Sequence, residues 1–456
     1  MTATITDVGA ADPTTAVGRR VPVGRCYRFE LVKLISQWRV RLLILAAWVV
    51  PAVLVSQVSR QSTLPADTAF GRWMHATGWA GSLVALGFAG TYALPLLTSL
   101  VAGDVFAAED RLGTWRHLLV TIRSPRRIFA AKALASLTVI VVMMIGLTCS
   151  SMAAVATIGN RPLVGLDGHL LTSADAAGKV ALAWLCALAP VLALASIGLL
   201  GSVTLGRSPM GLLLPALAGL AMDGAQILPL PAAVRVALPS YGFIAWRGLF
   251  TSPVQLGPLL LSIAVSLVWA VVATGLAYWL FLRRDFTNVT DDSLVRRTLT
   301  VGVLPFAVVY ALTIGILALS VPGTTSSGIT QGKLQQSVST GFAHLYRIQT
   351  EELHRPGVTE AELRASTSCD NGGGLQAASG PGNGWRCTVT WHLPGISNAV
   401  GKAVYQLDVT PDGRYVADGD GPIQVNGYFL VRTPTGDAAN PLWQFDGTVD
   451  LLTTKG

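Results

Sequence analysis

The chain has 456 residues, of which 51% are hydrophobic and only 13% are charged. A soluble protein of this length is rarely so apolar, so the composition argues for a membrane protein. The formal net charge is +8, and the basic residues gather beside the apolar segments, which favours contact with a membrane surface and argues against nucleic-acid binding.

The first segment, residues 1–24, is polar and contains no apolar core, so we expect a disordered cytoplasmic tail and no cleaved signal peptide. Residues 27–40 then combine apolar and basic side chains at helical spacing. This pattern predicts a helix lying in the membrane interface, with Glu30, Lys33 and Arg39 among its charged residues. Such a helix can also be a simple anchor.

Several apolar segments are long enough to cross a bilayer, which takes about 20 residues per helix. We expect seven spans, at about 42–58, 78–101, 133–158, 180–203, 210–229, 256–282 and 301–321. The fifth contains Asp223, the clearest ionisable residue within a span. Because a charge inside a bilayer is costly, Asp223 is a candidate for a substrate or gating role; the alternative is a solvated end of the span.

The distribution of lysine and arginine predicts the orientation, because both favour the cytoplasmic ends of spans. Eighteen basic residues fall on the side of the N-terminal segment, and six fall in the intervening loops on the other side. The N-terminus is therefore expected in the cytoplasm. Seven spans then place the residues after 321 outside the cell membrane.

A charged loop at 102–132 separates the second and third expected spans, and it contains Phe106-x-x-Glu109-x-x-x-Gly113-Thr114. A helix over 104–119 would place Phe106 and Glu109 about one turn apart. We expect an exposed aromatic ring beside a carboxylate, which a partner protein can clamp.

A simpler interpretation of the same loop is electrostatic. Glu109 and Asp110 would then only neutralise Arg111 and Arg116 at the membrane surface, as most charge clusters do.

The chain changes character after the last expected span. Residues 322–456 hold nine basic and twelve acidic residues. A Ser, Thr and Gly linker is followed by a helical pattern from Leu334 to Leu353. Strand patterns follow at Trp385–Trp391, Lys402–Thr410, Gln424–Val431 and Trp443–Val449. We therefore expect an all-α polytopic membrane protein with a small C-terminal α+β domain outside the cytoplasm.

The five cysteines divide into two groups. Cys26 is expected in the cytoplasm, and Cys149 and Cys186 within spans, where a small buried side chain is an ordinary role. Cys369 and Cys387 flank a glycine-rich loop in the C-terminal domain, where an oxidising compartment favours a disulfide. If one expected span were wrong, they would be two reduced cysteines in the cytoplasm.

The sequence contains little catalytic chemistry. The six histidines are scattered, no metal-ligand spacing occurs and no nucleophile elbow is present. The segment Gly328-x-x-x-Gly332-Lys333 has the wrong spacing for a phosphate loop and lacks the Ser or Thr after the lysine. We therefore expect no cofactor and no ATP hydrolysis by this chain, so that a partner subunit or an ion gradient must drive any transport.

The arrangement resembles the membrane subunit of an ATP-binding-cassette exporter, of the six-helix class that moves drugs, lipids or polysaccharides. Three features carry the resemblance: Glu30-Leu31-x-Lys33-Leu34 with Arg39, the loop motif followed by Ser124-Pro125-Arg126-Arg127 and Lys132, and an aromatic, proline-rich segment from Pro229 to Phe250. It covers roughly residues 25–284. The helix and loop of 285–322 and the domain of 323–456 are additional to the six-helix pattern.

The resemblance implies an exporter of a hydrophobic or amphiphilic substrate, and the Ala-, Gly- and Val-rich composition with arginine over lysine suits a bacterium. It implies a separate ATPase subunit that holds ATP and Mg, and a second permease that is a copy of this chain or a homologue. Phe106, Glu109, Gly113 and Thr114 would contact the ATPase, and membrane lipid would surround the spans.

Two other functions stay open. A membrane-anchored sensor or binding protein would work through its outer domain, and co-purification without an ATPase would favour it. A membrane-embedded enzyme has less support, because no polar cluster is evident. The identity of the substrate does not follow from the sequence.

Overall fold

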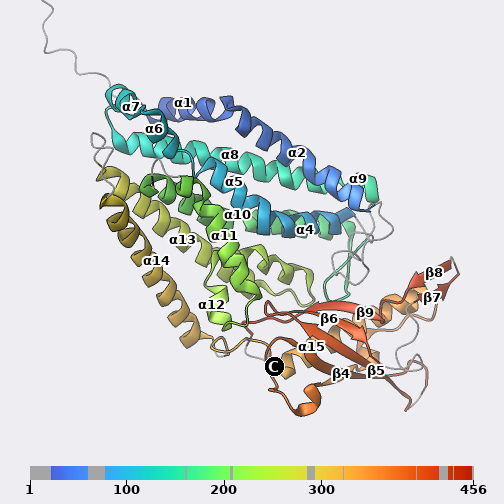
Figure 1. Cartoon of the computed structure of the whole chain (residues 1–456). Helices are drawn as coiled ribbons and strands as arrows, with labels where there is room; N and C mark the ends of the chain where they lie inside the picture. Colours follow the sequence, from blue (N-terminus) through green and yellow to red (C-terminus); the bar gives the residue numbers. More distant parts are fainter. Residues whose placement is uncertain are drawn as a thin grey trace, which may run out of the picture.

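The computed structural model describes residues 22–59, 78–159, 162–205, 209–284, 293–321, 323–396, 398–420, 430–434 and 436–453. The expected disordered tail lies outside these ranges except for residues 22–24. The described residues form a set of long helices and a C-terminal sheet with its own helix (Figure 1).

The helical part begins with two helices, α1 and α2, that pack against the later helix α8 (Pro125–Ala153). The chain order is α1 Val23–Ser36, α2 Trp38–Ser59, α4 Gly78–Phe88, the π-helix η1 Ala89–Ala93, and α5 Leu94–Val101. At Gln37 the backbone is extended, with φ −70° and ψ 127°, so α1 and α2 are separate helices. Gly90 in the π-helix is needed for packing, because a Cβ there would lie 2.9 Å from Phe243. The absence of a side chain at Gly90 therefore lets the π-helix approach Phe243 closely.

The loop motif forms two short helices where the sequence predicted one. They are α6 Ala107–Leu112 and α7 Trp115–Ile122. Gly113 between them has φ +65°, the left-handed conformation that ends a helix and that glycine adopts at little cost. The single helix expected over 104–119 is therefore wrong in this detail.

The remaining helical part continues to residue 320. It consists of α8 Pro125–Ala153, α9 Val155–Ile158, the strands β1 Leu163–Val164 and β2 Leu170–Leu171, α10 Ser173–Leu205, α11 Pro209–Ile227, α12 Ala232–Val236, the 3-10 helices η2 Pro239–Phe243 and η3 Ala245–Phe250, α13 Leu256–Leu282, and α14 Ser293–Ser320.

Among the described residues, six helices are long and apolar enough to cross a membrane. They are Trp38–Gln57, Gly78–Val101, Pro125–Ile158, Ser173–Leu205, Leu256–Leu282 and Val303–Ser320. The segment Gly211–Ile227 is a shorter apolar helix and corresponds to the fifth expected span. The expectation of about seven spans is thus confirmed, with six helices of full length and one shorter apolar helix within the described ranges.

The C-terminal domain places one helix on an antiparallel sheet. Its elements are α15 Gln331–Glu352, α16 Glu360–Leu363, β3 Ser366–Asn371, η4 Gly372–Gly374, β4 Gly382–His392, β5 Val400–Val409, β6 Arg414–Gly419, β7 Leu430–Thr433, β8 Gly436–Ala439 and β9 Gln444–Thr448. The main sheet has the order β3-β4-β5-β6-β9, and β7 and β8 form a separate hairpin. On β5, Ala403, Tyr405 and Leu407 are buried at every second position, so one face of the sheet forms the core under α15.

The sequence predicted the α+β class and located three strands that match β4, β5 and β9. The expected strand at Gln424–Val431 lies mostly outside the described residues and overlaps only the start of β7. The polar strands β3 and β6 were not predicted. The disulfide between Cys369 and Cys387 is confirmed, and the two cysteines lie directly opposite each other on β3 and β4.

Candidate functional site

The loop motif lies at the end of the helices that is opposite the C-terminal sheet (Figure 1). The backbone N–H groups of Phe106 and Ala107 both donate to Ser202 Oγ on α10, at 2.9 Å each. A helix leaves its first N–H groups without internal partners, and here a side chain from another helix accepts them. Ser202 therefore ties the start of α6 to α10.

Phe106 is fully buried, with 0% of its surface exposed. Its ring centroid lies 5.1 Å from that of Phe281, 5.3 Å from that of Phe129 and 6.3 Å from that of Trp115. The expectation of an exposed aromatic ring is therefore wrong. The ring is part of an aromatic core that joins α7, α8 and α13, and such a core holds the motif rigidly.

Glu109 is also buried, at 1% exposure. Lys132 Nζ donates to Glu109 Oε1 at 2.7 Å and to Glu30 Oε2 at 2.9 Å, while Lys33 and Thr114 also donate to the Glu109 carboxylate. Burial acts to raise the pKa of Glu109, but the charge of Lys132 and these hydrogen bonds outweigh it and lower the pKa to about 2. Glu109 is therefore ionised at neutral pH.

Two further carboxylates complete the charge network. Asp104 pairs with Arg39 and with Arg111. Asp110 Oδ1 accepts hydrogen bonds from Trp115 Nε1 at 2.6 Å and from Arg284 at 2.7 Å. The simple neutralisation of Arg111 and Arg116 by Glu109 and Asp110 is therefore not the arrangement found, since the carboxylates bridge different helices.

The three charged residues expected on the interfacial helix all enter this network. Glu30 and Lys33 lie on α1, where they bond Lys132 and Glu109 respectively. Arg39 lies at the start of α2 and not on the same helix. The ion pairs bind α1 and α2 to the loop between α5 and α8.

The exposed surface of α6 and α7 was missed by the sequence reasoning. Leu112 is 69% exposed and Val120 is 66% exposed, with Arg116 and His117 exposed between them. The sequence did contain a signal for this surface. The apolar residues Trp115 and Ile122 lie two helical turns apart on α7 and are buried, so Arg116 and Val120 point away from the buried face.

Asp223 lies on α11 and takes no part in this network. Within the residues that the structure describes, its Oδ2 atom is buried and accepts no hydrogen bond. Neighbouring Gln226 donates to the backbone O of Arg235 and to Ser240 Oγ.

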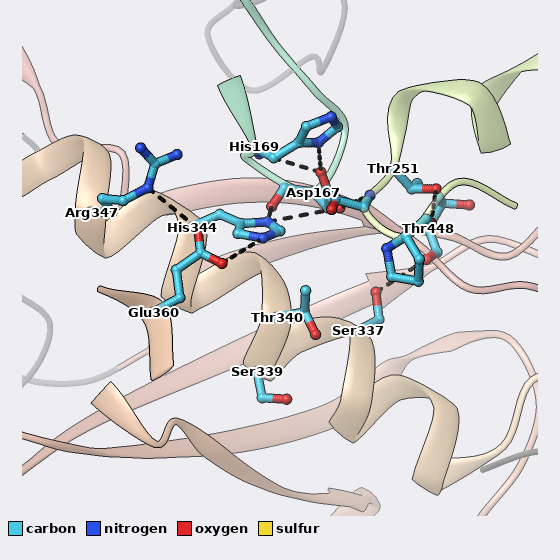
Figure 2. A network of polar contacts seen from close by, with 12 residues as sticks. Asp167, His169, Thr251, Ser337, Ser339, Thr340, His344, Arg347, Glu360 and Thr448 are labelled. Carbon is cyan, nitrogen blue, oxygen red and sulfur yellow. Dashed lines mark hydrogen bonds and ion pairs between the residues drawn. The ribbon is translucent and has the colours of Figure 1, made fainter. Parts of the chain in front are cut away.

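A second polar cluster joins the hairpin β1–β2 to the C-terminal domain, and Figure 2 shows it from close by. Asp167 in the hairpin is 2.5 Å from His169 Nδ1 and accepts the backbone N–H of Ser252. His344 on α15 reaches the backbone O of Asp167 at 3.1 Å, and its Nε2 lies 3.0 Å from Glu360. Burial acts to raise the pKa of Asp167, but the hydrogen bonds and His169 lower it.

Two arginines extend this junction. Arg235, which is buried, donates to the backbone O of Pro411, Ser327 and Leu230. Arg247 pairs with Asp412, and the charge of Arg247 helps to lower the pKa of Asp412 against the effect of burial. Among the described residues, no group of three or more His, Cys, Asp or Glu side chains can hold a metal ion.

Comparison with known families identifies the helical part. Residues 28–206 match the model of the ABC-2 family transporter protein. The match begins within α1 and contains α2 to α10, including the loop motif and its charge network. The helical part from α1 to α10 is thus similar to ABC-2 family transporter membrane proteins, and the chain also has further apolar helices and a C-terminal sheet domain.

Proteins of this family are multi-pass membrane subunits, typically non-catalytic, that pair with ATP-binding-cassette ATPase subunits. No curated protein and no solved structure matches the chain. Residues 207–456, with the C-terminal domain, lie outside the matched segment.

Proposed function

We propose that this chain is the membrane subunit of an exporter for a hydrophobic or amphiphilic substrate, driven by a separate ATPase subunit. The observation that carries the proposal is the exposed surface of Leu112, Arg116 and Val120 on two short helices within the family segment. An exposed apolar pair beside a cation suits a protein contact, because water solvates two large aliphatic side chains poorly.

The buried residues of the motif connect this exposed surface to the long helices. Glu109 is bonded to Lys33 on α1 and Lys132 on α8, while Asp110 is bonded to Arg284 at the end of α13. A displacement of α6 and α7 by the ATPase would therefore move several spans together. In this proposal Phe106 and Glu109 transmit the movement, and Gly113 and Thr114 form the turn that presents the contact surface.

The proposed topology follows from the side of the membrane on which lysine and arginine are concentrated. We infer that α6, α7 and the N-terminal residues face the cytoplasm and that the domain of 323–456 lies outside. Residues 25–284 would form the permease unit, and 285–322 a cytoplasmic loop with one further span. Two such chains, or this chain and a homologue, would assemble with two ATPase subunits, because one six-helix unit is half of the translocation path in this class. Asp223 is proposed to face that path.

The coupling surface is tested by purifying the full chain with its ATPase from the native membrane. We expect the purified pair to turn over ATP, and the double variant Leu112→Asp, Val120→Asp to lose the ATPase subunit. The matched control is Leu375→Asp, because Leu375 is 93% exposed but lies on the C-terminal domain. Retention of a fully active ATPase by the double variant would overturn the assignment, as would ATP turnover by the chain alone.

The orientation has a separate test. In intact cells a membrane-impermeant amine reagent should label Lys402, which is exposed on β5. Cys369 and Cys387 should react with an alkylating agent only after reduction. Protection of Lys402 in intact cells together with free thiols would place the domain in the cytoplasm.

A further inference from the structure

The C-terminal domain contains a cavity of about 480 Å³ between α15, the core face of the sheet and the hairpin β7–β8. Sites for small organic molecules commonly measure about 300–1,000 Å³. The cavity lies outside the family segment and far from the loop motif.

One wall of the cavity is aromatic. Phe342 and Tyr346 come from successive turns of α15, Trp391 from β4 and Tyr405 from β5. The ring centroid of Trp391 lies 4.6 Å from that of Phe342 and 5.9 Å from that of Tyr346. Opposite Trp391 on β5 stands Gly401, where a Cβ would lie 2.4 Å from the indole ring. Because Gly401 has no side chain, the indole of Trp391 can lie directly against the backbone of β5.

The opposite wall is the hairpin. In the described part of the chain β7 and β8 pair only with each other. A two-stranded hairpin is marginally stable unless its side chains pack against something. Leu430 and Val431 of β7 line the cavity, and Leu430 is exposed. An apolar ligand between the two walls would supply the packing that this hairpin lacks.

The polar groups of the cavity divide into those that are bonded and those that are available. Tyr405 Oη donates to the backbone O of Leu442 at 2.8 Å, and Gln349 donates to Asn440 at 2.7 Å. Trp391 Nε1 is buried, and it finds no hydrogen-bond acceptor in the described structure. A buried N–H without an acceptor is costly, so a ligand with an acceptor would relieve it.

Two cations stand at the rim of the cavity. Arg355 follows α15 and Arg432 lies on β7, and both side chains are exposed. Neither forms an ion pair with a carboxylate of the described residues. A guanidinium group offers paired N–H donors that fit a carboxylate, sulfonate or phosphate.

We propose that this cavity binds an amphiphilic organic anion. Its apolar ring or chain lies against the aromatic wall, and its anionic group contacts Arg355 and Arg432. An acceptor atom of the ligand takes the N–H of Trp391. The proposal does not rest on the proposed transport function, because every residue that forms the site lies between 342 and 442, outside the family segment.

The test uses the full chain in nanodiscs of neutral lipid, with empty nanodiscs as the background. Equilibrium dialysis measures binding of two probes, 2-naphthoate and laurate. We expect saturable binding of about one probe molecule per chain. Binding of laurate alone assigns the site to acyl lipids, and binding of naphthoate assigns it to ring anions; both support the proposal. Absence of saturable binding for both probes would overturn it.

Variants locate the site. We expect Arg432→Glu and Tyr346→Ala each to weaken binding roughly tenfold or more, and Trp391→Phe to weaken it about 3- to 10-fold, because that change removes the N–H and part of the ring but keeps an aromatic side chain. The matched control is Lys402→Glu, which reverses one charge at an exposed position of β5 and should leave binding unchanged. An intact disulfide under non-reducing conditions verifies that each variant is folded. Equal affinity of wild type, Arg432→Glu and Trp391→Phe would contradict the proposal.

Discussion

The two ends of the helical part each contain a buried polar network, but the two networks are built in opposite ways. In the network around Glu109 and Lys132, the contacts among Glu30, Lys33, Glu109 and Lys132 lie within the segment that matches the transporter family. The network around Asp167 and His344 joins groups 177 residues apart, and one partner lies outside that segment. The core of the first network therefore lies within the matched segment, whereas the second network reaches into the part of the chain outside it.

The chemistry differs as well. Around Lys132 both partners are full charges that are removed from water, with exposures of 1% to 2%. At the junction with the C-terminal domain, Arg235 and His344 bind backbone oxygens, beside the ion pair of Arg247 with Asp412. A network of full charges is destroyed by the loss of one member, because the others stay buried and uncompensated. A network of carbonyl acceptors weakens in smaller steps.

The largest effect is expected for Lys132→Met. The change leaves Glu30 buried beside Glu109 without the ammonium between them. Breaking a buried pair in this way costs about 3–5 kcal/mol, so the variant should give little folded protein. The measurement is the thermal midpoint and yield of monodisperse protein in detergent. Arg126→Met on the exposed side of α8 is the control, and similar losses in both variants would show that the ion pairs are not the cause.

A smaller effect is expected for Arg235→Met. This variant leaves the carbonyl groups of Ser327 and Pro411 without their donor, at a cost of about 2–3 kcal/mol, since hydrogen bonds to a charged group are stronger than neutral ones. The loss should be local to the junction. Hydrogen exchange should therefore accelerate at Ala232 and Ala233, whose N–H groups donate to Ser326 and Thr324. Unchanged exchange there would mean that Arg235 does not hold the domain.

These differences explain what the sequence could predict. The loop motif was visible because its charged and aromatic residues lie close together in the chain, between two apolar segments. Its burial was not visible, because Phe106 packs on Phe281 and binds Ser202 through its backbone, and both partners are distant in sequence. The role of the motif in contacting an ATPase stays a prediction.

The C-terminal domain shows the same limit. Alternating apolar residues predicted β4 and β5, and two cysteines around a loop predicted the disulfide. The strand β3 has the sequence Ser-Thr-Ser-Cys-Asp-Asn, which has no apolar alternation, and it forms because β4 pairs with it along its whole length. The junction between the hairpin β1–β2 and the C-terminal domain could not be predicted, since Asp167, Arg235 and His344 come from three separate segments.

A pH-dependent effect is expected for Asp167→Asn. The pKa of Asp167 is lowered in the folded protein, so its contribution to stability is complete above the ordinary value of about 3.9 and is lost as the pH falls through the lower folded value. At pH 7 the variant should be less stable by about 1.5–2 kcal/mol, the lower part of the range for a hydrogen bond to a charged group.

The stability difference between wild type and Asp167→Asn should shrink as the pH falls below about 4, because the carboxyl group becomes protonated first in the unfolded wild type and, at lower pH, in the folded protein as well. His169, His344 and Lys179 are the basic side chains that face Asp167 or sense its charge. Asp175→Asn at the exposed start of α10 is the control. A difference that stays constant down to pH 2 would show that the charge of Asp167 does not stabilise the junction.

The smallest effect compares two glycines, one at each end of the helices. A Cβ would meet no atom within 4 Å at either Gly113 or Gly178, so neither substitution is crowded. Their backbones differ, because Gly113 has φ +65° and Gly178 lies inside the helix α10. Alanine in the left-handed region costs about 1 kcal/mol, whereas alanine within a helix gains about 0.5–1 kcal/mol.

Gly113→Ala should therefore lower the thermal midpoint of the purified chain, and Gly178→Ala should raise it. Because the added methyl group is the same, opposite signs isolate the backbone conformation as the cause. The Gly113 variant should also alter the ATPase contact, since the turn orients Leu112 relative to α7. Two shifts of the same sign would contradict the view that Gly113 is a turn required by the coupling surface.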